Sequence, residues 1–233
     1  MKKLSIVILT SMLFFSSIAL ATDKFNDAIK AYSAGNYTQA IKLFKPLALK
    51  GDAYAQHNIG VMYNDGLGVV QDYAEAVKWF RLAAEQGLAS AQFNLGGMYL
   101  KGHGVVQDYN IAHMWFSLAG AQGNASAQSN LGAMYSGGQG VVQDYIEAVK
   151  WFRLGAAQGD ATALYNLGVM YGKGLGVVQD YVIAHMWFNL AGAQGYKDAI
   201  KSREAAETAM TAQHIAEAQK LARECLARQY KGC

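Results

Sequence analysis

Charge is scarce in this chain of 233 residues. Only 16% of the residues are Asp, Glu, Lys or Arg, and the formal net charge is +3. Loss of Lys2 and Lys3 with the leader described next would lower that charge to +1. So small a charge exerts little long-range attraction on nucleic acid or anionic lipid. A nucleic-acid-binding protein is therefore not expected, while 52% hydrophobic residues exclude a disordered chain.

Long apolar runs are also missing, with one exception at the start. Residues 1–21 read MKKLSIVILTSMLFFSSIALA, a basic start followed by an apolar run and small residues. This pattern predicts a secretory signal peptide cleaved between Ala21 and Thr22, with an uncleaved membrane anchor as the alternative. No cysteine follows the run, which excludes a lipoprotein anchor. No later stretch approaches the roughly 18 apolar residues of a membrane span. We expect bacterial export to the periplasm or beyond, with no membrane span after cleavage.

Motifs for catalysis and for metal binding are missing too. The sequence contains no G-x-S-x-G and no phosphate loop, and its histidines show no metal-ligand spacing. The aspartates that recur once per block are each explained as helix caps. We therefore expect no catalytic centre, no metal and no cofactor. The five histidines are His57, His103, His113, His185 and His214.

What the sequence does contain is an internal repeat of 36 residues. Four glycine-started blocks span 51–86, 87–122, 123–158 and 159–194, and 19 of the 36 positions are identical in all four. A fixed period of this length is typical of a solenoid, in which each unit buries its apolar face against its neighbours. The four tryptophans occupy one repeat position and are interpreted as core rather than as a ligand cage: Trp79, Trp115, Trp151 and Trp187.

Each block divides into two predicted helices. In the first block, one helix covers about 52–64, with Ala55, Ile59 and Met62 on one face. Glycines in the sequence NDGLG end that helix by allowing left-handed backbone. The second helix begins at Asp72, whose side chain can accept from amides of the first turn. With Glu75 it forms a D-x-x-E variant of the capping box, which Asp144 and Glu147 repeat.

The recurring A-x-x-N-(I/L)-G-x-M-Y, G-x-G-V and D-Y-x-x-A-x-x-W-F motifs cover residues 51–194. They resemble Sel-1-like repeats, which are relatives of tetratricopeptide repeats. The resemblance implies an all-α fold, a right-handed solenoid of paired antiparallel helices with a concave inner face. Residues 22–50 resemble a degenerate repeat that caps the N-terminal end. Residues 195–233 begin as another first helix and continue into a charged amphipathic helix, which predicts a C-terminal cap.

The two cysteines, Cys225 and Cys233, would enter an oxidising compartment after export. On one continuous helix their Cα atoms would lie roughly 12 Å apart, too far for a bridge. A disulfide therefore requires the helix to end near Tyr230 and the tail to fold back, and two free thiols are the alternative. Some cysteine-rich secreted Sel-1-like proteins are linked to penicillin binding and β-lactamase activity. This chain has no cysteine in 51–194, which weakens the case for the same activity in this protein.

The positions that vary among the blocks lie on one stripe of the first helix, at block positions 4, 7, 11 and 14. By resemblance to tetratricopeptide repeats, this stripe faces a concave groove that binds peptides. An asparagine beside it would hydrogen-bond the backbone of the ligand. The alternatives are a solvated face free to vary and asparagines that tie neighbouring helices together. The candidate groove residues are Tyr54, His57, Asn58, Phe93, Asn94, Asn130, Tyr165 and Asn166.

The second helices alternate with a period of 72 residues. Blocks one and three carry E-A-V-K-W-F-R-L, whereas blocks two and four carry I-A-H-M-W-F-(S/N)-L. The basic pairs Lys78/Arg81 and Lys150/Arg153 are interpreted as solvated surface. Met114 and Met186 either belong to that surface or mark an apolar docking strip.

These observations lead to one function and two alternatives. We expect an exported, non-catalytic adaptor that binds a protein or peptide partner of unknown identity through the groove. A β-lactam-binding or β-lactamase-like hydrolase is the alternative enzyme. A purely structural envelope protein or a secreted host-directed factor is the third possibility.

Overall fold

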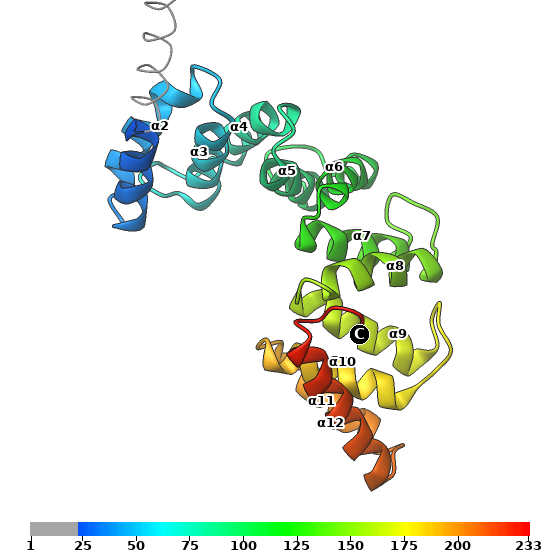
Figure 1. Cartoon of the computed structure of the whole chain (residues 1–233). Helices are drawn as coiled ribbons and strands as arrows, with labels where there is room; N and C mark the ends of the chain where they lie inside the picture. The colour runs from blue at the N-terminus through cyan, green and yellow to red at the C-terminus, as the bar shows by residue number, and fades with distance from the viewer. Residues whose placement is uncertain (1–22) are drawn as a thin grey trace, which may run out of the picture. The chain divides into compact units, whose positions relative to one another are not determined.

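A computed structural model describes residues 23–233. The predicted signal peptide, residues 1–21, and its cleavage site lie outside the described residues. Every regular element among residues 23–233 is a helix, which confirms the all-α class (Figure 1). Within this part of the chain, no helix is long and apolar enough to cross a membrane.

The helices follow one another in pairs, as the repeats predict. A helix over 23–33 precedes the numbered elements. These are α2 (Tyr37–Ala48), α3 (Ala53–Asp65), α4 (Tyr73–Glu85), α5 (Ala89–Lys101), α6 (Tyr109–Ala121), α7 (Ala125–Gly137), α8 (Tyr145–Ala156), α9 (Ala161–Lys173), α10 (Tyr181–Ala193), α11 (Lys197–Glu207) and α12 (Ala212–Ala227).

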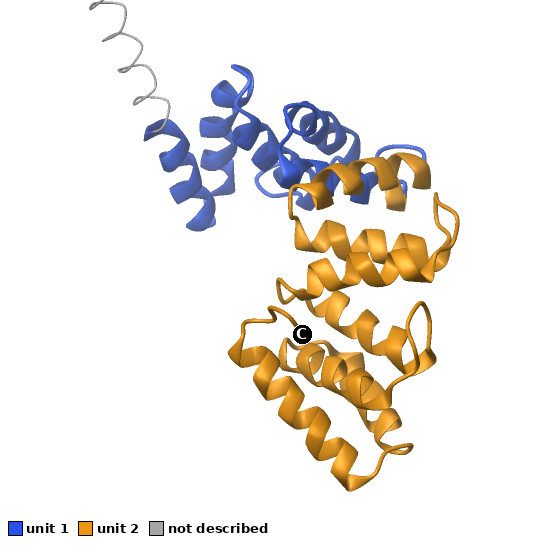
Figure 2. Cartoon of the chain, turned by 45° about the vertical axis from the view of Figure 1, so that its right-hand side comes forward, with its two compact units in different colours: residues 1–98, 102–106 blue, residues 99–101, 107–233 orange. Residues whose placement is uncertain are grey.

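The chain divides into two compact units (Figure 2). Unit 1 comprises residues 1–98 and 102–106, and its described part holds α2, α3, α4 and most of α5. Unit 2 comprises residues 99–101 and 107–233 and holds α6 through α12. Within each unit, the two helices of a repeat pack against each other, α3 on α4, α7 on α8 and α9 on α10.

The first helix of each repeat is bounded as the sequence predicts. At the start of α3, the Asp52 side chain accepts from the Ala55 amide at 2.8 Å. Its end is fixed by Gly66, whose φ of 69° lies in the left-handed region that only glycine adopts at little cost. The predicted face is buried, since Ala55, Ile59 and Met62 are all in the core.

The second helix begins at the predicted aspartate, but the capping box is only half formed. Asp72 accepts from the amides of Ala74 and Glu75 at 2.9 and 3.0 Å. Its own amide donates to the Tyr63 carbonyl rather than to Glu75, and the Glu75 carboxylate pairs with Lys78. The capping box predicts a second hydrogen bond, from the backbone amide of the capping aspartate to the glutamate side chain, and this prediction is wrong for Glu75. It is also wrong for Glu147, whose carboxylate pairs with Lys150 instead. The loop brings Asp72 so close to the first helix that the Tyr63 carbonyl oxygen accepts the hydrogen bond from the Asp72 amide.

The second glycine of each G-x-G loop has a role beyond turning the chain. A Cβ atom on Gly140, whose φ is 70°, would lie 2.4 Å from the Tyr109 carbonyl oxygen of the preceding repeat. Gly176 stands in the same relation to Tyr145. The loop of one repeat thus rests on the first turn of the second helix before it, and only a residue without a side chain fits there.

Phenylalanines form the centre of the core. Phe44, Phe80, Phe116, Phe152 and Phe188 recur at the 36-residue spacing and are nearly fully buried. Their rings press on glycines of the first helices, so that a Cβ on Gly60, Gly132 or Gly168 would meet the ring at 2.5–2.6 Å. The tryptophans lie beside this column, with Trp187 buried and the other three half-buried.

The C-terminal end closes unit 2 with two helices, as predicted. α11 packs on α10 where the first helix of a next repeat would lie. α12 returns and packs on α10 instead of pairing with α11. It contributes Ala218, Ala222 and Cys225 to the core. This return differs from the helix pairing in the repeats, and it covers the outer face of α10.

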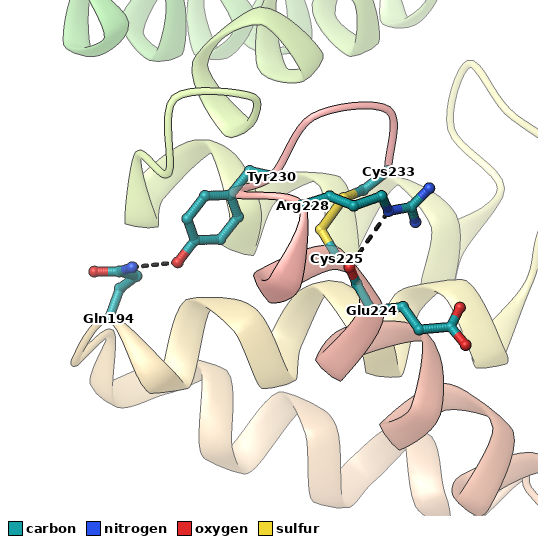
Figure 3. The surroundings of a disulfide bond; sticks show 6 residues. All are labelled: Gln194, Glu224, Cys225, Arg228, Tyr230 and Cys233. Carbon is teal, nitrogen blue, oxygen red and sulfur yellow. Dashed lines mark hydrogen bonds between the residues drawn. A yellow bond between two sulfur atoms is a disulfide. The ribbon is translucent and has the colours of Figure 1, made fainter.

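A disulfide joins Cys225 to Cys233, with the two Cα atoms 5.6 Å apart (Figure 3). The helix ends at Ala227, and the tail folds back through Gln229 and Tyr230, which both have positive φ. This confirms the bridged alternative. The Tyr230 hydroxyl accepts from the Gln194 side-chain amide, and its ring lies over Gly159. The bridged loop therefore holds the cap against the last repeat.

Candidate partner-binding face

The eight predicted groove residues all lie on first helices, and we call the surface of the first helices within each unit the first-helix face. In unit 1, α3 and α5 carry Tyr54, His57, Asn58, Phe93 and Asn94. In unit 2, α7 and α9 carry Asn130, Tyr165 and Asn166.

Tyr54 is the most open aromatic residue of the first-helix face. Its side chain is 62% exposed, and its ring meets Phe25 edge-on at 6.4 Å. Phe93, on α5, is half-buried. An aromatic ring that is open on one side and supported on the other offers a large contact area at low entropic cost.

His57 connects two repeats in unit 1. Its Nε2 lies 3.0 Å from the Asn94 side-chain nitrogen, so Nε2 is unprotonated and accepts from that amide. The ring also lies against Phe80, 5.8 Å between centroids. Burial lowers the pKa of His57 below its usual 6.5. For Asn94 the alternative interpretation therefore applies, because its side chain ties neighbouring helices together through His57.

Asn58 and Asn130 behave differently from Asn94. Each side-chain amide donates back to the carbonyl four residues earlier, to Tyr54 and to Ser126 respectively, both at 2.8 Å. Each amide thereby uses its donor within its own helix, and its Oδ1 remains an available acceptor. That oxygen makes no other hydrogen bond within residues 23–233, and both asparagines are half-buried. Asn166 is also half-buried and makes no side-chain hydrogen bond with the described chain.

The equivalent of His57 in the third block is Ser129, which is buried. Its Oγ donates to Asp160 at 2.6 Å, and Asp160 also caps α9 by accepting from the Ala163 amide at 2.9 Å. One carboxylate therefore begins α9 and links it to α7. Block position 7 lies where consecutive first helices meet, so its side chains are partly used in packing between repeats.

Tyr165 is likewise partly used in packing between neighbouring helices. Its ring stacks on Tyr196 with 4.5 Å between centroids and tilts against Phe188 at 5.7 Å. Its hydroxyl accepts from Ser202 at 3.4 Å. Tyr196 and Ser202 come from the C-terminal cap, and sequence reasoning missed both. The signal was available, because Tyr196 occupies block position 2 in a fifth, incomplete block.

Few side chains among residues 23–233 are arranged for metal binding or nucleophilic catalysis. No three His, Cys, Asp or Glu side chains within residues 23–233 cluster in a way that could hold a metal ion. The Ser129–Asp160 pair resembles half of a nucleophile–base pair, but Ser129 is 2% exposed. A substrate cannot reach that hydroxyl. The described arrangement is suited to holding a partner through aromatic contacts and amide hydrogen bonds.

Comparison with known proteins places this geometry in a family. The Sel1 repeat family matches residues 30–52, 53–88, 89–124, 125–160 and 161–196. The matches cover most of the chain, and the protein belongs to the Sel1 repeat family. None of the curated proteins matches the chain.

Two solved structures share both the fold and part of the sequence. One is a protective antigen present in uropathogenic Escherichia coli strains and displaying an SLR fold, with 36% identity and a TM-score of 0.77. The match covers 92% of this chain but only 47% of the antigen, so the chain spans about half its length. The other is a Sel1 repeat protein from Oxalobacter formigenes, with 31% identity, a TM-score of 0.76, and coverage of 87% and 82%.

Proposed function

We propose that this Sel1 repeat protein is an exported, non-catalytic scaffold that holds an extended segment of a partner protein along its first-helix face. The fold is that of a repeat scaffold, and repeat scaffolds present extended binding surfaces built from successive units. The site of binding, the export and the lack of catalysis are the specific parts of the proposal.

The observation that carries the proposal is the shared geometry of Asn58 and Asn130. Each uses its amide donor within its own helix and leaves Oδ1 as an acceptor with no partner among residues 23–233. An acceptor beside a helix face suits the N–H groups of an extended backbone, which have no partner of their own. Tyr54 adds an open aromatic contact surface in unit 1. Within unit 2, Asn130 and Asn166 occupy block position 8 of consecutive repeats, which suits a ligand that runs from one repeat to the next.

Export is supported by the leader-like residues 1–21 and by the cysteines. A disulfide between Cys225 and Cys233 persists in an oxidising compartment such as the periplasm. The likeness to a protective antigen of uropathogenic Escherichia coli is consistent with export. N-terminal sequencing of protein recovered from envelope and secreted fractions tests this part. A chain that begins at Thr22 is expected, and one that begins at Met1 contradicts cleavage.

Partner binding is tested by quantitative capture from envelope and secreted fractions. The bait is the purified chain, compared with the variant Asn58→Ala, Asn130→Ala, Asn166→Ala. These side chains make only bonds within their own helices or none, so helical content and melting temperature should stay close to wild type. We expect a protein enriched by the wild type to be depleted by more than about tenfold with the variant. Equal capture by both baits contradicts binding through the first-helix face.

A matched control uses the loops between the two helices of a repeat. Val70, Val142 and Val178 protrude from the loops and are each almost 90% exposed. Their replacement by Ser should leave capture unchanged if the partner lies on the first helices. Loss of capture with this control would place the partner on the loops instead.

A further inference from the structure

The second helices of repeats two and four have nearly the same sequence but different surroundings. α6 reads YNIAHMWFSLAGA and α10 reads YVIAHMWFNLAGA, which differ at two positions. Both helices belong to unit 2. They therefore act as an internal comparison, in which the side chains are fixed and only the neighbours change.

The outer side of α10 is covered, whereas the same side of α6 is open. Met186 is 4% exposed and Leu190 is fully buried. Their counterparts on α6, Met114 and Leu118, are 47% and 45% exposed. We call Met114 and Leu118, one turn apart on α6, the α6 strip. Two apolar side chains with the same sequence context are thus buried in one repeat and open in the other.

The element that covers α10 is α12, and the structure shows its chemistry. α12 buries small residues at successive turns, Ala218, Ala222 and Cys225, with Leu221 half-buried beside them. Its exposed residues include the charged side chains Glu217, Lys220, Arg223 and Glu224. It packs on α10 rather than pairing with α11 as the second helix of a repeat would. No comparable packing joins α8 to α6, so the regular stacking of repeats leaves the α6 strip free.

α6 also lacks what an exposed helix normally has. None of its thirteen residues is charged, whereas the equivalent α8 carries Glu147, Lys150 and Arg153. At the register of Met114, the first and third repeats have Lys78 and Lys150. A helix without charge on its outer side has the composition of one that is covered. The lysines of this register have side chains that are 67% and 63% exposed, whereas the methionine register is covered in α10 and open in α6.

We propose that the α6 strip is a docking site for an amphipathic helix of a partner protein that presents alanine-sized residues at successive turns, as α12 does to α10. Small residues let the partner helix approach closely, and the Met114 and Leu118 side chains would fill the spaces between them. This site is on the second helices and is independent of the first-helix face.

The test uses α12 itself as the probe. A fluorescently labelled peptide with the sequence of residues 211–228, carrying Cys225→Ser to prevent disulfide exchange, is titrated with the purified chain by anisotropy. We expect saturable binding. Met114→Lys in the chain should weaken it by more than about tenfold, because the ammonium would be buried beside apolar groups. Lys occupies this register in two other repeats, so this variant should keep the wild-type melting temperature.

Two matched controls locate the binding. Lys150→Met, at the same register of α8, should leave the affinity of the α6 strip unchanged. A peptide with Glu in place of both Ala218 and Ala222 should not bind, because its small-residue face is lost. The absence of saturable binding, or equal affinity of wild type and Met114→Lys, would overturn the proposal. Self-association of the chain that depends on Met114, without peptide binding, would overturn it in favour of a second copy as the occupant.

Discussion

The ring of Phe152 presses on Gly132 so closely that a Cβ atom there would lie 2.5 Å from the ring carbon Cδ1. The two residues belong to the two helices of one repeat, and Gly60 with Phe80 and Gly168 with Phe188 repeat the contact. The phenylalanine column therefore depends on glycines that sit inside helices, where glycine is otherwise unfavourable. This contact sets how closely the two helices of a repeat approach.

Gly132→Ala is expected to destabilise unit 2 by about 1–3 kcal/mol, because the added methyl group displaces the Phe152 ring. Gly97 provides the control, since a Cβ there meets nothing within 4 Å. Gly97→Ala should stabilise α5 by about 0.5–1 kcal/mol through helix propensity. Urea unfolding curves measure both. A Gly132→Ala variant as stable as Gly97→Ala would mean that the helices separate at no cost.

The loop glycines allow a second comparison between crowded and open sites. Gly140 and Gly123 both have positive φ, but only Gly140 faces the Tyr109 carbonyl, with open space around Gly123. Gly123→Ala should cost about 1 kcal/mol from backbone strain alone. Gly140→Ala should cost more, because the loop must also leave the preceding repeat. Thermal melts of both variants report the order, and equal losses would contradict the close approach.

Acidification should weaken unit 1 through His57. Its pKa lies below 6.5 because the ring is buried, and in the unfolded chain it returns to about 6.5. As the pH falls through 6.5, the unfolded state takes up a proton that native His57 does not. The free energy of unfolding therefore decreases with falling pH. Between pH 7.5 and 5 the melting temperature should drop less for His57→Tyr than for the wild type. Tyr is chosen because it occupies the same block position in the fourth block.

Burial also lowers the pKa of His113, so part of the pH dependence should survive in His57→Tyr. His113→Val, which places the valine of repeats one and three in this register, should remove that part. A pH dependence unchanged in the double variant would assign it to other groups.

Reduction of the disulfide should loosen the C-terminal cap. The bridge between Cys225 and Cys233 closes a short loop, and its loss costs about 2–3 kcal/mol on the chain-entropy account. The contacts of Tyr230 with Gln194 and Gly159 depend on that loop. Melting with and without a phosphine reductant should show a lower transition for the reduced chain. Tyr230→Ala should reproduce part of that loss in the oxidised chain, and an unchanged melt on reduction contradicts a stabilising role.

The repeat pattern predicted the local structure closely, and the reason is physical. Capping aspartates and loop glycines act within a few residues, so Asp72 and Gly66 reveal their roles in the sequence itself. Four aligned copies then separate the required residues from the variable ones. The predicted bounds of α3 and the predicted start of α4 agree with the structure within one residue.

Contacts between distant residues could not be read in this way. The bond between His57 and Asn94 joins residues 37 positions apart. The packing of α12 on α10 depends on the turn between α11 and α12, which directs α12 away from the place of the second helix of a repeat. The stacking of Tyr165 on Tyr196 also needs the cap in place. These contacts show that position 7 of the variable stripe is partly structural, and they leave Tyr54, Asn58, Asn130 and Asn166 as the better test positions.

The measurement that most directly tests partner binding along the first helices is site-specific photocrosslinking in the producing cell. A photoreactive phenylalanine analogue is placed at Tyr54 or at exposed Ala133 on the first helices, and at exposed Val142 on a loop. We expect the first two positions to crosslink to the same partner protein, identified by mass spectrometry, and Val142 not to crosslink to it. Crosslinks from Val142 alone, with none from the first helices, would contradict this expectation.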